Sequence, residues 1–303
     1  MRMTAGTWGM LLALSVLWGG SFFFVEIIVA AIPPLMLVWL RVALAALALL
    51  VFLRLTGRSL PMTRAAWVAF LGMGLLNNVV PFSLIAWGQT EIASGLASII
   101  NAMTPVSAVV LAHFLTADEA LTPGRITGVL MGLAGVVVLI GVEALEGIGV
   151  AVVAQIAVLA ATISYGFAGI WGRRFKRLGI EPTVAAAGQV TGSTLLLAIP
   201  AFVVAPPWAL PMPSLAVVFS ILGLAVLSTA LAYVLFFRIL AAAGAGNVML
   251  VTLLVPPSAI LLGWGFLDET LEARQIAGMA LIGLGLLWLD GRAIGWLTAR
   301  RPG

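Results

Sequence analysis

The stretch GLASIINAMTPVSAVVLAHFLTADEALTPGRITGVLMGLAG, residues 95–135, occurs a second time as GNVMLVTLLVPPSAILLGWGFLDETLEARQIAGMALIGLG, residues 246–285. Each copy is an apolar run that contains a proline, then an acidic turn, then a glycine-rich apolar run. Pro105 corresponds to Pro256, and Glu119 corresponds to Glu269. A repeat of this length predicts that the chain consists of two copies of one structural unit.

The composition predicts a membrane protein. Of the 303 residues, 63% are hydrophobic and only 9% are charged, whereas about a quarter of the residues of a soluble domain are charged. The chain has no Cys, which excludes disulfides and thiolate metal sites, and its single His argues against a zinc site. The net charge of +4 is explained by anchoring at a membrane surface, so a nucleic-acid partner is not needed.

Apolar segments long enough to cross a bilayer predict an all-α integral membrane fold with ten transmembrane helices. Such a helix needs about 20 apolar residues. The first run is longer than the apolar core of a signal peptide, so we interpret it as a retained helix. The predicted spans are residues 8–29, 35–53, 66–87, 93–115, 125–142, 150–171, 184–204, 215–237, 247–267 and 274–291.

The number of spans in each half determines how the two halves are oriented in the membrane. Residues 1–147 and residues 148–303 each contain five spans. Because five is odd, the second half enters the membrane from the opposite side, which predicts two inverted repeats. With the N-terminus in the cytoplasm, nearly all of the 15 basic residues fall on the inner side. Basic residues gather in cytoplasmic loops, so we expect both termini in the cytoplasm.

Inverted repeats are typical of secondary transporters, whose substrate site lies at mid-membrane between the halves. Several motifs along the chain also resemble EamA-type proteins of the drug/metabolite transporter superfamily. The motifs are Leu17-Trp18-Gly19, Arg41, Phe82-Ser83-Leu84-Ile85-Ala86-Trp87, Ala93-Ser94-Gly95-Leu96-Ala97, Thr104-Pro105, Glu119-x-Leu121 and Gly128. The resemblance implies a multi-pass protein of the bacterial inner membrane that exports small organic metabolites, such as hydrophobic or aromatic amino acids. It implies no cofactor and no soluble partner.

Other functions remain as alternatives at this point. A multidrug carrier fits the same architecture. A carrier of phosphorylated or nucleotide-linked sugars would need several cations in the cavity, whereas Arg41 is the only Lys or Arg away from the ends of a predicted span. An intramembrane enzyme would need paired acids or a hydrolase motif, and neither H-E-x-x-H nor G-x-S-x-G occurs. A structural or receptor-like protein would not require inverted halves. The oligomeric state is left open.

Polar and aromatic residues at matching depths of the two halves are the candidates for a shared cavity. Polar side chains inside spans are costly unless they face protein or water. Simple hydrogen bonding between helices, at about 0.6–2 kcal/mol per bond, is the competing explanation. The candidates are Trp18, Asn77, Asn78, Phe82, Asn101, Thr104, Tyr165, Thr229, Tyr233 and Thr252.

Prolines and charged residues near the spans have competing interpretations. Pro105 and Pro256 at equivalent positions suggest hinges, although packing kinks explain them equally well. Arg41 either pairs with Glu26 or extends to headgroups, or it contacts a substrate anion. Glu119 and Glu269 are expected to cap residues 125–142 and 274–291. Since no carboxylate lies near the middle of a span, we expect transport driven by the gradient of the substrate itself.

Overall fold

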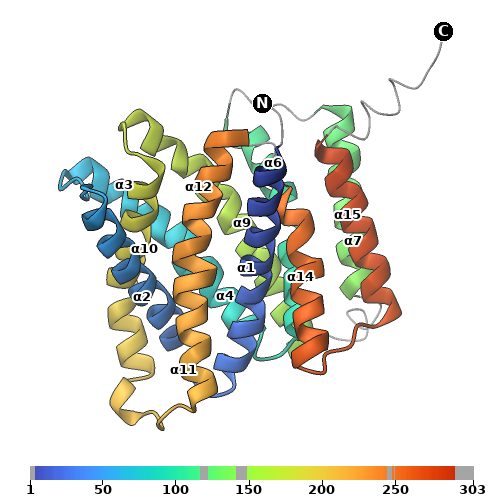
Figure 1. The fold of residues 1–303 in the computed structure, drawn as a ribbon. Helices are drawn as coiled ribbons and strands as arrows, with labels where there is room; N and C mark the ends of the chain where they lie inside the picture. The colour runs from blue at the N-terminus through green and yellow to red at the C-terminus, as the bar shows by residue number, and fades with distance from the viewer. Residues whose placement is uncertain (1–3, 117–121, 141–148, 244–247, 249, 291–303) are drawn as a thin grey trace.

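The computed structural model describes residues 4–116, 122–140, 149–243, 248 and 250–290, and these form helices joined by short connections (Figure 1). All ten predicted spans are present. The first half contains α1 (Ala5–Val29), α2 (Pro34–Leu55), α3 (Arg64–Gly74), η1 (Leu75–Val79), α4 (Val80–Gly88), α5 (Ser94–Asn101), α6 (Thr104–Leu115) and α7 (Pro123–Ile140). The second half contains α9 (Val150–Arg177), α10 (Pro182–Val204), η2 (Pro207–Ala209), α11 (Leu215–Leu222), η3 (Gly223–Leu231), α12 (Ala232–Ala243), α14 (Val251–Phe266) and α15 (Ala273–Asp290).

Three of the spans consist of more than one helical segment. Residues 64–88 form one span from α3, η1 and α4, and residues 215–243 form another from α11, η3 and α12. The third, residues 94–115, is interrupted between α5 and α6. Seven of the described spans have 18 or more residues and enough hydropathy to cross a bilayer, and residues 126–140, 251–266 and 273–288 form shorter apolar helices.

Local sequence explains several helix ends. Pro34 and Pro182 occupy the first positions of their helices, where the missing N–H removes no helical hydrogen bond. The side chains of Thr63 and Ser214 accept backbone N–H bonds at the starts of α3 and α11. The basic run of residues 173–177 forms the last turns of α9, which ends at Arg177, just before Gly179 with its positive φ of 65°.

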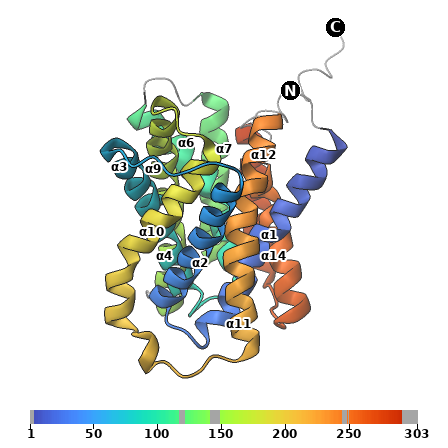
Figure 2. The same cartoon turned by 60° about the vertical axis from the view of Figure 1, so that its left-hand side comes forward.

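The helices of the two halves are exchanged between two bundles. In the α1 bundle, α1 and α2 from the first half pack on η3, α12 and α14 from the second. In the α9 bundle, α9 and α10 from the second half pack on α3, η1, α4 and α6 from the first. Figure 2 shows α1, α12 and α14 on the right and α3, α9 and α10 on the left. The surface along which the two bundles meet is called the seam below.

The glycine-rich parts of the repeat pack directly on each other. Helices α7 and α15 lie side by side at one edge of the molecule (Figure 1). A Cβ atom added to Gly135 would lie 2.8 Å from the Gly278 carbonyl oxygen, and one added to Gly285 would lie 2.7 Å from the Gly128 carbonyl oxygen. These glycines therefore form a close-packing face, and its partner is the equivalent face of the other half.

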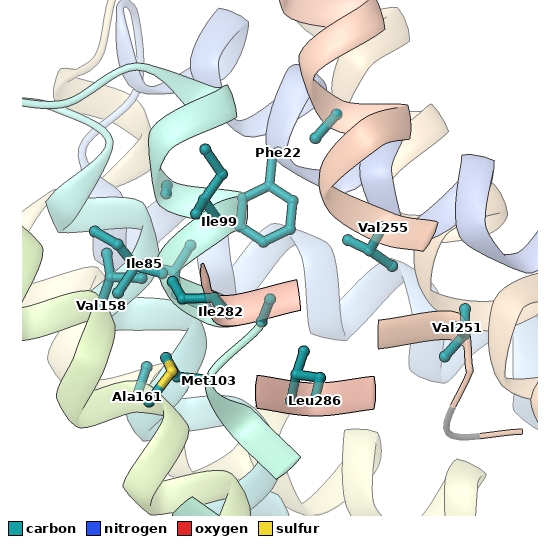
Figure 3. Close-up of a cluster of buried hydrophobic side chains, with 14 of the residues drawn as sticks. Phe22, Ile85, Ile99, Met103, Val158, Ala161, Val251, Val255, Ile282 and Leu286 are labelled. Atoms are coloured by element: carbon teal, nitrogen blue, oxygen red, sulfur yellow. The ribbon is translucent and has the colours of Figure 1, made fainter. Parts of the chain in front are cut away.

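A cluster of buried apolar side chains connects the two bundles. It includes Phe22, Ile99, Met103, Val158 and Val255, which come from both halves of the chain (Figure 3). The cluster therefore joins helices that are distant in sequence.

Candidate functional site

Two π-helical segments lie at equivalent positions in the two halves. Asn77 and Asn78 lie in η1, and their counterparts Ser228 and Thr229 lie in η3. A π-helix changes the hydrogen-bond register of the backbone and occurs often at functional sites. Two carbonyl oxygens in these segments accept side-chain bonds: Leu76 from the Ser164 hydroxyl at 2.7 Å and Leu224 from the Thr229 hydroxyl at 2.8 Å.

A network of hydrogen-bonded polar side chains crosses the seam near the middle of the spans formed by residues 64–88 and 215–243. The Asn77 amide donates to the Tyr233 hydroxyl at 3.1 Å, and that hydroxyl donates to Asn78 Oδ1 at 3.1 Å. Asn78 and Asn77 belong to the α9 bundle, whereas Tyr233 belongs to the α1 bundle. Three of the predicted cavity residues are thus in direct contact, and the contact joins the two parts of the molecule.

Two further members of this network, Gln189 and Ser193, were not predicted from the sequence. Asn77 also donates to Gln189 Oε1 at 3.1 Å, and the Asn78 amide donates to Ser193 Oγ at 2.9 Å. Both partners lie in α10 and are buried. Their polarity in the middle of an apolar span was the available signal, but matching depths between the halves do not select them.

Arg41 lies beside this network as a buried cation. Its Nε donates to the Thr229 hydroxyl at 3.0 Å, and its guanidinium carbon lies 3.6 Å from the centroid of the Phe82 ring. The side chain is 7% exposed, so it does not extend to headgroups. It does not pair with Glu26 either, because that carboxylate accepts from Gln89 instead. Burying a charge without an ionic partner costs several kcal/mol, and a cation–π contact offsets only about 2 kcal/mol of it.

Two of the predicted aromatic residues lie near the same region. The phenols of Tyr165 and Tyr233 are near enough to Arg41 for an electrostatic interaction. Trp18 contacts Phe236 with ring centroids 5.6 Å apart. The aromatic rings thus come from both bundles.

Among the remaining predicted residues, Asn101 and Thr104 contact each other. Thr104 donates to the backbone carbonyl of Asn101 at 2.7 Å, and Asn101 Oδ1 is buried without a partner. These two residues flank the break between α5 and α6, and Pro105 is the second residue of α6. Pro256 instead lies within the continuous helix α14. Thr252 is partly buried near the start of α14.

A second polar group closes the seam at the end where α1 and α14 end and α5 begins, called the Glu26 side below. Gln89 Nε2 at the end of α4 donates to the Phe22 carbonyl and to the Glu26 carboxylate of α1, both at 2.9 Å. Gln89 is 2% exposed. This buried amide links the α9 bundle to the α1 bundle.

Glu269 makes the other link on the Glu26 side. Its carboxylate accepts from the backbone N–H groups of Ser94 at 2.9 Å and Gly95 at 3.0 Å, the first two residues of α5. The prediction that Glu269 caps residues 274–291 is therefore wrong: it caps a helix of the other half. The helix dipole explains the choice of a carboxylate at this N-terminus. Glu119 lies outside the described residues.

A basic groove lies apart from both polar groups. Its volume is about 560 Å³, and it is lined by Arg64 of α3 and by Arg174 and Arg177 of α9. Arg174 stacks on Trp171, with its guanidinium carbon 3.6 Å from the ring centroid. The groove lies at the ends of these helices and does not reach the seam residues named above.

Comparisons with known proteins agree with this architecture. The model of the EamA-like transporter family matches residues 7–141 and 152–289. An uncharacterized transporter, YoaV of Bacillus subtilis, is 25% identical over 91% of this chain and 94% of its own length. The uncharacterized inner membrane transporter YedA of Escherichia coli is 28% identical over 90% of this chain and 87% of its own length.

Two other matches cover almost the whole chain. A probable amino-acid metabolite efflux pump of Escherichia coli is 26% identical, with 95% of both chains covered. A crystal structure that is 21% identical has a TM-score of 0.67 and covers 99% of this chain, which shows a shared fold. With both halves matched by the family model, this chain belongs to the EamA-like transporter family and is a multi-pass membrane transporter.

Proposed function

We propose that this transporter exports small organic metabolites, with hydrophobic and aromatic amino acids as the substrate class, by alternating access between its inverted repeats. Residues 1–147 and 148–303 are the two repeats, and both termini face the cytoplasm. The observation that carries the proposal is the hydrogen bonding of Tyr233 to Asn77 and Asn78 across the seam. A polar group at this depth, between parts that must move apart, suits a substrate that replaces those bonds.

The distribution of seam contacts supports alternating access. On the Glu26 side, Gln89 joins the two bundles through a buried hydrogen bond, and Glu269 joins the two halves of the chain through a partly buried one. Charge placement predicts that this side is outer. A substrate from the cytoplasm would reach the Tyr233 network while the outer end is closed, and release outside would require the Gln89 and Glu269 bonds to break.

The aromatic surroundings and the related pump support the substrate class. Tyr165, Tyr233 and Phe82 lie beside Arg41, which suits apolar or aromatic side chains. The Escherichia coli relative is named as a probable amino-acid metabolite efflux pump. We therefore expect amino-acid flux in preference to flux of sugar phosphates, because Arg41 is the only Lys or Arg within the middle of a span.

Flux through proteoliposomes tests the proposal. Vesicles containing the purified protein are loaded with phenylalanine, leucine or a hexose phosphate, and efflux is compared with that from empty vesicles. Tyr233→Phe removes the hydroxyl that makes two bonds of the network. Each such bond contributes about 0.6–1.7 kcal/mol, so flux should fall at least about tenfold. Thr194→Val is the matched control, because Thr194 bonds only the Val190 carbonyl of its own helix. Wild-type efflux equal to that of empty vesicles for every compound would refute the proposal.

A further inference from the structure

Arg41 has bonding capacity that no described residue uses. Its Nε donates to Thr229, but Nη1 and Nη2 have no acceptor among the described residues. Neither of these nitrogens belongs to the buried polar atoms that are sealed off without a partner. Since the side chain keeps 7% of its surface exposed, the free edge of the guanidinium faces space that a small molecule or water can occupy.

The surroundings of Arg41 lack a countercharge. Its electrostatic partners within the described chain are the phenols of Tyr165 and Tyr233. The nearest bonded groups, the Thr229 hydroxyl and the Phe82 ring, are neutral. A guanidinium presents two parallel N–H groups that match a carboxylate, and a buried cation without an ionic partner is a functional-site hypothesis by default within a membrane.

We infer that Arg41 binds the carboxylate of the transported substrate. The inference rests on the proposed function and narrows it: the substrates are carboxylic acids or zwitterions with one carboxylate. Thr229 and Phe82 hold the guanidinium from one edge and one face, so its remaining edge is aimed at the substrate. A single cation leaves one of the two charges of a phosphate monoester unpaired, so such compounds should be transported more slowly than carboxylates.

Arg41 lies where a bound anion would be next to both bundles. Arg41 and Thr229 belong to the α1 bundle, whereas Phe82 belongs to the α9 bundle. Tyr233, within electrostatic range, bonds Asn77 and Asn78 across the seam. An anion on Arg41 would therefore bind next to the hydrogen bonds that must rearrange during transport.

Matched pairs of compounds with and without a carboxylate provide the test. Initial efflux of L-phenylalanine and L-phenylalaninamide is measured in proteoliposomes for wild type, Arg41→Gln, Arg41→Lys and Thr229→Val. Wild type should prefer the acid, and Arg41→Gln should lower acid flux about 100-fold, which is about 2.7 kcal/mol at 1.36 kcal/mol per tenfold, and remove the preference. Arg41→Lys should keep part of the preference because it keeps the charge without the planar pair of donors.

Thr229→Val removes the hydrogen bond to Arg41 Nε but keeps the positive charge and its contact with Phe82. The preference for the acid should therefore fall less than in Arg41→Gln. Equal wild-type flux of acid and amide, or an unchanged preference in Arg41→Gln, would overturn the inference and leave the transport function intact. No wild-type flux of any compound would instead overturn the proposed function.

If Arg41→Gln does not fold, the inference can still be tested by measuring how ligands change the melting temperature of the wild type. The melting temperature of the detergent-solubilised wild type should rise with added L-phenylalanine and not with L-phenylalaninamide. An equal rise with both compounds, or a rise with the acid that persists in a folded Arg41→Gln protein, would overturn the inference.

Discussion

The link between Glu269 and the start of α5 is expected to hold the Glu26 side of the seam closed. The carboxylate accepts two backbone N–H bonds, from Ser94 at 2.9 Å and Gly95 at 3.0 Å. A hydrogen bond to a charged group contributes about 1.5–3 kcal/mol. Glu269→Gln retains one acceptor oxygen but places an NH₂ donor against the second N–H, so the link should weaken by about 2 kcal/mol. At 1.4 kcal/mol per tenfold, the open fraction should rise about 30-fold.

The absence of Cys from the chain makes this opening measurable. Ser94 is 0% exposed and its hydroxyl has no hydrogen-bond partner, so Ser94→Cys is a conservative reporter at the closed seam. A membrane-impermeant maleimide, applied to vesicles from each side in turn, should label this Cys slowly. Adding Glu269→Gln should raise the labelling rate from the Glu26 side about 30-fold.

Glu272→Gln provides the matched control for the same loop. Glu272 lies outside the spans, and its hydrogen bond with Arg274 lowers the pKa of its carboxyl, so it is charged at neutral pH. The carboxylate contacts Arg274 and makes no bond across the seam. Its substitution should leave the labelling rate unchanged. An unchanged rate in Glu269→Gln, or an equal increase in both variants, would refute the role assigned to Glu269.

Three further predictions concern packing and transport. Gly135→Ala should lower stability by about 1–3 kcal/mol through overpacking against α15, as read from the melting temperature, whereas Gly283→Ala, with nothing within 4 Å of its added Cβ, should not. Pro105→Ala and Pro256→Ala should slow flux more than they weaken substrate binding, and a loss of binding with flux per bound substrate unchanged would contradict the hinge hypothesis. Phenylalanine counterflow should persist without any ion gradient; loss of flux whenever the proton or sodium gradient is removed would contradict gradient-driven transport.

Much of the site could be predicted from residue types and repeat symmetry. Asn77 and Asn78 are amides in the middle of an apolar span, and Tyr233 is a hydroxyl-bearing residue in the equivalent span. Each needs a partner because unpaired polar groups are costly in a bilayer. Gln189 and Ser193 escaped the prediction because they supply partners from a different span, and no symmetry between the halves points to them.

The prediction for Glu269 was wrong for a related reason. A carboxylate in an interhelical turn caps some helix N-terminus nearby, and the next helix in the chain is the simplest choice. The exchange of helices between bundles instead brings the start of α5 to this turn. Arg41 and Glu26 both lie in the α1 bundle, but the Glu26 carboxylate accepts a hydrogen bond from Gln89 of the α9 bundle instead. Sequence neighbours therefore do not predict contacts between the bundles.

The sequence by itself determined the solvent, the number of spans and the inversion of the halves. Apolar composition, span length and an odd number of spans per repeat are properties of the chain alone. Only the tertiary structure decided that Tyr233 bonds Asn77 and Asn78 and that Arg41 is buried beside them. It also decided that Glu269 caps α5, a helix of the other half. These contacts depend on which helix faces meet, and in lipid that choice follows from side-chain packing and glycine contacts between distant segments.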